Sequence, residues 1–119
     1  MTECVTQDVS REEARGDTND PRPPLSEDTV EAVASIFRVL ADPIRIRLVE
    51  ALNDRGRATG SALAASLPVT QQNVSKHLRV LYHAGIVRRH REGVWTHYEL
   101  ADFVGVWLIE QVGAALSSN

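Results

Sequence analysis

The chain has 119 residues, a formal net charge of −3 and a hydrophobic fraction of 43%. This length suits one domain with its own core, and the single cysteine, Cys4, excludes an internal disulfide or paired-cysteine metal site. The N-terminus lacks the features of a signal peptide, and no uncharged apolar run reaches the roughly 20 residues that cross a bilayer. We therefore expect a soluble, cytoplasmic protein.

Charge is distributed unevenly along the chain. Residues 1–31 carry nine acidic residues against three arginines, which leaves the remainder with a net charge of +3. No carboxylate lies between Asp54 and Glu92, and this stretch holds seven cations: Arg55, Arg57, Lys76, Arg79, Arg88, Arg89 and Arg91. Such a stretch indicates a surface that meets phosphates, because a merely solvated face usually mixes both signs.

The N-terminal part of the chain predicts an arm followed by two helices. Residues 1–24 are polar and acidic and end in NDPRPP, so we expect a disordered arm there, one domain over residues 25–116 and a tail over 117–119. Ser26 is a good helix cap, and the apolar stripe that follows predicts a first helix: Val30, Val33, Ala34, Phe37 and Leu40. Asp42 and Pro43 predict the start of a second helix, which ends near Leu52.

Two short helices follow, separated by LPV. The first begins at Thr59 or Ser61 and the second at Thr70, an arrangement typical of a helix-turn-helix. In the second helix, Val74, Leu78 and Leu81 recur at helical spacing and face the core. The outward residues are Gln71, Gln72, Ser75, Lys76 and Arg79. Glutamine reads adenine edges and the cations reach guanine or phosphate, so this face suits the major groove, although alone it could be an ordinary solvated face.

The segment GIVRRHREGVWTHYEL, residues 85–100, predicts a β-hairpin. With Glu92 and Gly93 at the tip, the expected pairs are Arg91 with Val94, His90 with Trp95, and Arg88 with His97. One face then carries Val87, Val94, Tyr98 and Leu100, with Arg89 and Arg91 nearer the tip; the other carries Arg88, His90, Trp95 and His97. A basic hairpin after such a helix is a wing, whose Arg88, Arg89 and Arg91 contact phosphates or a minor groove.

The last segment, residues 101–116, is apolar nearly all round and predicts a helix buried on several sides. A monomer of this size would leave one side exposed, which favours a two-fold dimer formed by the first and last helices. The expected interface residues are Val33, Phe37, Phe103, Trp107, Leu108 and Val112. A membrane-bound helix is disfavoured because Asp102 and Glu110 interrupt a run already too short to span.

These elements predict a mainly α-helical winged helix-turn-helix fold with a small β-hairpin: four helices, two strands and a fifth helix. Three stretches, LADPIRIRLVEAL, VTQQNVSKHLRVLYHAGIVRRHREG and YEL, resemble the ArsR/SmtB family of bacterial transcriptional regulators over about residues 30–116. The resemblance implies a homodimer that binds a palindromic operator in double-stranded DNA, mostly as a repressor released by a metal ion or another chemical signal. It also implies that Gln71, Gln72, Ser75 and Lys76 touch the major groove.

The effector is left open by the sequence. Metal-sensing family members place cysteines in the second helix, or an Asp-x-His pair with a later His and acid in the last helix. Here the second helix has no cysteine, and Val104, Ala115 and Ser118 occupy the positions expected to partner Asp102. His90 and His97 could be diagonal neighbours on the wing, but an exposed basic strand is a poor cation site. A transition-metal cofactor is therefore implied by resemblance only, and the metal-ligating residues are unknown.

Two other classes of protein are alternatives to a DNA-binding regulator. An enzyme is disfavoured because no Gly-rich phosphate loop and no recognisable catalytic spacing of nucleophile and histidine is present. The second alternative is a dimeric interaction module, or a co-regulator that needs a partner protein to sense its signal. His77 and His83 are expected to pack or contact phosphate, and Cys4 to be inert. The sequence leaves open the alternative that the Cys4 thiol is a ligand together with residues of the dimer partner.

Overall fold

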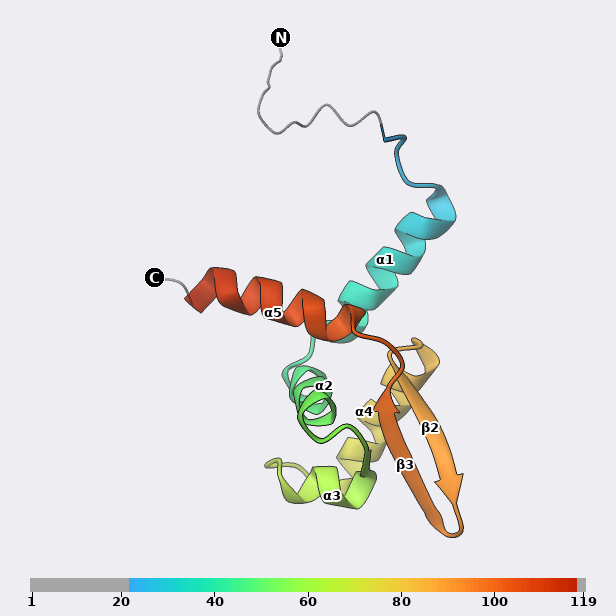
Figure 1. Ribbon diagram of the computed structural model, residues 1–119, viewed down its shortest axis with the longest axis vertical. Helices are drawn as coiled ribbons and strands as arrows, with labels where there is room; N and C mark the ends of the chain where they lie inside the picture. The colour runs from blue at the N-terminus through green and yellow to red at the C-terminus, as the bar shows by residue number, and fades with distance from the viewer. Residues whose placement is uncertain (1–21, 118–119) are drawn as a thin grey trace, which may run out of the picture.

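A computed structural model describes residues 22–117 of the chain (Figure 1). The helices and strands in this range, in chain order, are α1 (Glu27–Leu40), α2 (Pro43–Arg55), β1 (Ala58–Thr59), α3 (Gly60–Ala65), α4 (Gln71–His83), β2 (Val87–Glu92), β3 (Trp95–Leu100) and α5 (Val104–Ser117). The predicted five helices are therefore confirmed. The predicted arm over residues 1–24 and the tail lie largely outside the described residues, as does Cys4, so those expectations stay predictions.

Side-chain caps begin the first four helices. Ser26, Asp42, Thr59 and Thr70 stand in extended conformation before α1 to α4, and the side-chain oxygen of each accepts a backbone N–H of the following turn. These bonds satisfy donors that the helix itself leaves unpaired. The predicted caps are confirmed, and α3 is capped by Thr59 rather than by Ser61.

Two helix boundaries differ from those predicted. The second helix runs past Leu52 to Arg55 because its stop is Gly56, whose φ of +84° suits glycine and whose N–H bonds the carbonyl of Leu52. The last helix begins at Val104 instead of residue 101, because the Asp102 carboxylate accepts the Val104 N–H at 3.0 Å. β3 ends at Leu100, and residues 101–103 connect it to α5.

The core lies between α2, α3, α4 and the base of the hairpin. Its largest completely buried side chains come from α2, α3 and α4, joined by Val87 at the start of β2: Leu48, Val49, Leu52, Leu63, Val74, Leu78 and Leu81. The prediction for α4 is confirmed, since all three of its inward residues are fully buried. In Figure 1, α1 and α5 diverge from one end of this body while the hairpin tip points the other way.

The sheet contains one strand more than predicted. In it β3 is central, flanked by β2 and by the two-residue β1, and both pairs are antiparallel. Ala58 pairs with Tyr98 and Thr59 with His97, so the turn that precedes α3 is tied directly to the hairpin. The hairpin is therefore held by backbone hydrogen bonds on one of its edges as well as by its base.

The predicted register of the hairpin is wrong, because the turn lies one residue later in the chain than predicted. Glu92 pairs with Trp95, His90 with His97, and Arg88 with Glu99, so the turn is formed by Gly93 and Val94. Gly93 has a φ of +63°. A two-residue hairpin turn places a positive φ at its first central position, where glycine is favoured and Glu92 would be strained.

The two faces of the hairpin are nevertheless as predicted, because each cross-strand partner changes by an even number of residues. Val87, Arg89, Tyr98 and Leu100 share one face as predicted. Val94 does not join them; it stands in the turn and is 83% exposed. The predicted diagonal arrangement of His90 and His97 is also wrong, since the two are direct cross-strand partners.

Candidate nucleic-acid interface

The outward face of α4 is a continuous polar surface. The three core residues of α4 are completely buried, which fixes the opposite side of the helix toward solvent. The five polar residues predicted to face outward are all exposed and together line one shallow hollow: Gln71, Gln72, Ser75, Lys76 and Arg79. The structure thus brings this half of the predicted site together on one helix face.

The turn between α3 and α4 holds that face outward. Ser66 Oγ donates to the carbonyl of Leu63 at 2.9 Å, and the N–H of Val69 bonds the carbonyl of Leu67 at 2.8 Å. Thr70 then caps α4 by accepting the Asn73 N–H at 3.1 Å. These short-range bonds fix the angle at which α4 leaves α3, so the polar face belongs to a rigid pair of helices.

Lys76 and Arg79 carry charges that no acid in the described part of the chain neutralises. Within residues 22–117, neither side chain makes an ion pair. Each is exposed on the same face of α4 as the glutamines. Unpaired cations beside amide side chains form a surface that can hold a phosphate and a base edge at the same time.

The wing arginines differ in what they contact. Arg88 Nη2 lies 3.4 Å from a carboxylate oxygen of Glu99, and Arg57 Nε lies 3.7 Å from the other oxygen of that acid. Arg89 stacks over the ring of Tyr82 on α4, with its guanidinium carbon 3.8 Å from the ring centre. Arg91 lies by the turn, where its Nε is 3.5 Å from the carbonyl of Gly93. All three predicted wing arginines are exposed.

Two features of this surface were missed by the sequence analysis. Glu99 pairs with cations from two segments, Arg57 from the turn after α2 and Arg88 from β2, so it orders the base of the wing. Arg57 was counted in the basic stretch but was not proposed as a site residue. Arg89 is positioned by Tyr82, a contact worth about 0.5–1 kcal/mol at an exposed site. The hydrophobic pattern carried no signal for either contact.

The histidines do not form a metal site with other ligands in the described range. His90 Nε2 and His97 Nε2 lie 3.7 Å and 3.4 Å from the two carboxylate oxygens of Glu92, at the end of the hairpin. His83 is exposed, and its ring meets that of Tyr82 edge-on with centres 5.4 Å apart. Over residues 22–117, no three His, Cys, Asp or Glu side chains are grouped so that they could hold a metal ion.

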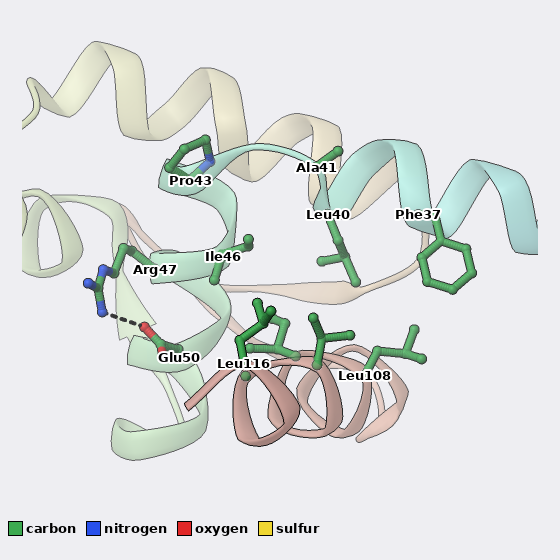
Figure 2. A pocket seen from close by; sticks show the side chains of 12 residues that line it. Phe37, Leu40, Ala41, Pro43, Ile46, Arg47, Glu50, Leu108 and Leu116 are labelled. Atoms are coloured by element: carbon green, nitrogen blue, oxygen red, sulfur yellow. Dashed lines mark hydrogen bonds and ion pairs between the residues drawn. The ribbon is translucent and has the colours of Figure 1, made fainter. Parts of the chain in front are cut away.

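A second exposed surface is apolar and lies on α1 and α5. The predicted interface residues are exposed on the single chain apart from Leu108, which is half-buried: Val33, Phe37, Phe103, Trp107 and Val112. Between α1, α2 and α5 runs a groove of about 610 Å³, lined mostly by apolar side chains (Figure 2). In Figure 2, Phe37, Leu40 and Ile46 face Leu108 and Leu116 across it, and the Arg47–Glu50 ion pair stands at one side. No helix in the described part of the chain could span a membrane.

Comparison with known proteins agrees with this geometry. Residues 40–90 match the helix-turn-helix domain family. The chain is 33% identical over 83 residues to the arsenical resistance operon repressor of Bacillus subtilis, covering 70% of this chain and 72% of that protein.

Solved structures show the same fold over most of the chain. The crystal structure of Rv0081 from Mycobacterium tuberculosis has a TM-score of 0.67 and 30% identity, covering 78% of this chain and 93% of that one. The antimony-specific transcriptional repressor AntR has a TM-score of 0.77 and 27% identity, covering 91% and 96% of the two chains.

A helix-turn-helix with an outward polar helix and an adjoining basic hairpin defines a DNA-binding transcriptional regulator of the winged-helix class, not an enzyme. The chain belongs to the ArsR/SmtB family of these regulators. This confirms the family and fold class expected from the sequence. The individual contact residues stay predictions.

Proposed function

We propose that this protein is a homodimeric repressor that binds a palindromic operator in duplex DNA. The observation that carries the proposal is the exposed face of α4, where amide side chains stand beside the unpaired cations Lys76 and Arg79. Gln71, Gln72 and Ser75 read base edges in the major groove, and the two cations hold phosphates or guanine.

The wing adds contacts beside the groove. Arg91 stands next to the turn and reaches farthest along the hairpin, so it meets the DNA backbone or an adjacent minor groove. Arg88 and Arg89 contribute positive potential nearer the base, where Glu99 and Tyr82 hold them in place. Phosphate contacts of this kind set position on the duplex, whereas α4 supplies the base preference.

The exposed apolar surface of α1 and α5 supports the dimer. Trp107 and Phe103 are 57% and 73% exposed on the single chain, and exposed apolar patches of this extent mark association surfaces. A second copy that covers the groove between α1, α2 and α5 would remove Phe37, Leu108 and Val112 from water. In a two-fold dimer the same surface of both copies is buried, and two α4 helices face successive major grooves about 34–36 Å apart, or a multiple of that.

The proposal also covers compartment and signal. The DNA partner of a bacterial regulator is in the cytoplasm, so the protein acts there. A chemical signal that releases the protein from its operator would fit the names of two relatives, which concern arsenic and antimony. Soft ions of that type favour sulfur ligands, and Cys4 would supply one cysteine sulfur per subunit. A partner protein that senses the signal is the other route.

The test is selection of duplexes from random DNA by the purified full-length protein, followed by binding titrations at several salt concentrations. We expect enrichment of an inverted repeat whose half-sites are one helical turn apart or a multiple, with affinity that falls steeply with salt. Titrations with arsenite, antimonite, divalent metals and oxidants on the enriched duplex then test the signal. Enrichment of no common sequence, at any salt concentration, would contradict the proposal and favour an interaction module.

A further inference from the structure

Three helices meet at one polar contact that the DNA-binding surface does not use. Arg45, in the first turn of α2, donates from Nε to the carbonyl of Val39 in the last turn of α1 at 2.6 Å. Its Nη1 lies 3.2 Å from Nδ1 of His77, in the middle of α4. Since guanidinium only donates, His77 accepts at Nδ1 and its ring carries a proton on Nε2.

The contact is anchored on its α2 side by a helix cap. Asp42 accepts the N–H groups of Ile44 and Arg45 at 2.9 Å and 3.2 Å, which fixes the first turn of α2 and with it the origin of the Arg45 side chain. Arg45 and His77 are both partly buried. The Val39 carbonyl belongs to the last turn of α1, which the helix leaves without an internal partner, so the guanidinium also completes the end of α1.

His77 lies on the back of α4 relative to its polar face. At about 100° per residue, it stands about 160° round the helix from both Ser75 and Arg79. A rotation or slide of α4 that moves the polar face over the DNA must therefore move His77 against Arg45. Neighbouring positions on α4 are filled by apolar core contacts, which have little directional preference, whereas this hydrogen bond is directional.

We propose that Arg45 is a positioning residue that ties the DNA-reading helix α4 to α1 through His77, and so sets the separation of the two α4 helices in the dimer. The inference rests on the proposed function, in which α1 belongs to the dimer interface. This contact would make the protein specific for the spacing of the two half-sites. With the Arg45–His77 hydrogen bond in place, the dimer binds one spacing; without it, the dimer tolerates several.

The experiment uses duplexes enriched from random DNA by the wild-type protein, with and without two extra base pairs between the half-sites. This insertion moves the half-sites about 7 Å farther apart and rotates one against the other. The measured quantity is the dissociation constant for the duplex with the two extra base pairs divided by that for the duplex without them. We expect His77→Ala to lower this ratio about tenfold, the factor that corresponds to one hydrogen bond to a charged group.

Two further variants serve as rescue and control. His77→Asn places an amide oxygen where Nδ1 accepts and restores the wild-type ratio. Val80→Ala, at an exposed position of the same helix, leaves the ratio unchanged. Thermal melts accompany each titration. If His77→Ala does not fold, His77→Gln replaces it, since glutamine is polar but carries its oxygen farther out than Nδ1.

The outcomes separate the two proposals. A wild-type protein that enriches no inverted repeat overturns the proposed function and this inference with it. An inverted repeat that the wild type and the folded His77 variants bind with equal spacing ratios overturns the inference alone. A reduced ratio in His77→Ala or His77→Gln, with rescue by His77→Asn, supports it.

Discussion

Trp107→Glu places a carboxylate on the apolar face of α5 and should convert the protein to monomers. Trp107 is 57% exposed on the single chain, and because a tryptophan buries up to about 250 Å², about 140 Å² is available for the interface. At about 25 cal/mol per Å² this is about 3.5 kcal/mol per copy, or about 7 kcal/mol as an upper estimate for two copies. Even a third of that weakens dimerisation about 50-fold.

Sedimentation velocity across a wide range of concentration measures the effect. The matched control is Val94→Glu, which introduces the same carboxylate in place of an apolar residue at the hairpin turn, where Val94 is 83% exposed and outside the proposed interface. We expect the control to remain a dimer and to melt like the wild type. A Trp107→Glu variant that sediments as a dimer at every concentration, or a Val94→Glu variant that dissociates, would refute the reasoning.

Two other substitutions test the charge on α4 and the cap of α2. Lys76→Ala should weaken binding to all duplexes and reduce the slope of log affinity against log salt concentration by about 0.9 for each lost phosphate contact, about 1.8 in a dimer. The control is Arg47→Ala, whose side chain pairs with Glu50 on α2 and which should leave this slope unchanged. An unchanged slope for Lys76→Ala argues against a phosphate contact. Asp42→Ala should lower the free energy of unfolding by about 1 kcal/mol at neutral pH. Burial would raise the pKa of Asp42, but hydrogen bonds from the backbone N–H groups of Arg45 and Ile44, together with the positive charge of Arg45, lower this pKa below its ordinary value. A carboxylate with a depressed pKa stabilises the folded state at neutral pH, and this stabilisation is lost as the pH falls. The difference in unfolding free energy between the wild type and Asp42→Ala, measured in denaturant titrations, should therefore become smaller in acid. A difference of constant size down to low pH speaks against this role of the carboxylate.

Short-range patterns predicted most of the helices and the polar face of α4. A cap such as Thr70 and a core stripe such as Val74, Leu78 and Leu81 depend on neighbours within one or two turns. Such signals can be identified directly in the sequence. The same holds for the two faces of the hairpin, because moving the turn by one residue changes each cross-strand partner by two residues, and alternation survives an even change.

Features that depend on distant segments were not predictable. The strand β1 is two residues long and exists only because it pairs with β3, so it has no periodicity of its own. The register of the hairpin depends on which residue adopts a positive φ, and EG allows two placements of the turn. The contact of Arg45 with His77 joins residues 32 apart in sequence, and its partners share no pattern that links them.

The most direct test of the central claim is the base preference of Gln72→Ala. Selection from random DNA should give the wild-type inverted repeat, except that one position in each half-site no longer prefers its base. The variant should lose about 1–3 kcal/mol of discrimination between bases at that position. Gln111→Ala makes the same change on α5 and should reproduce the wild-type preference. An unaltered preference at every position of the half-site in Gln72→Ala would contradict the claim that the exposed face of α4 reads the DNA sequence.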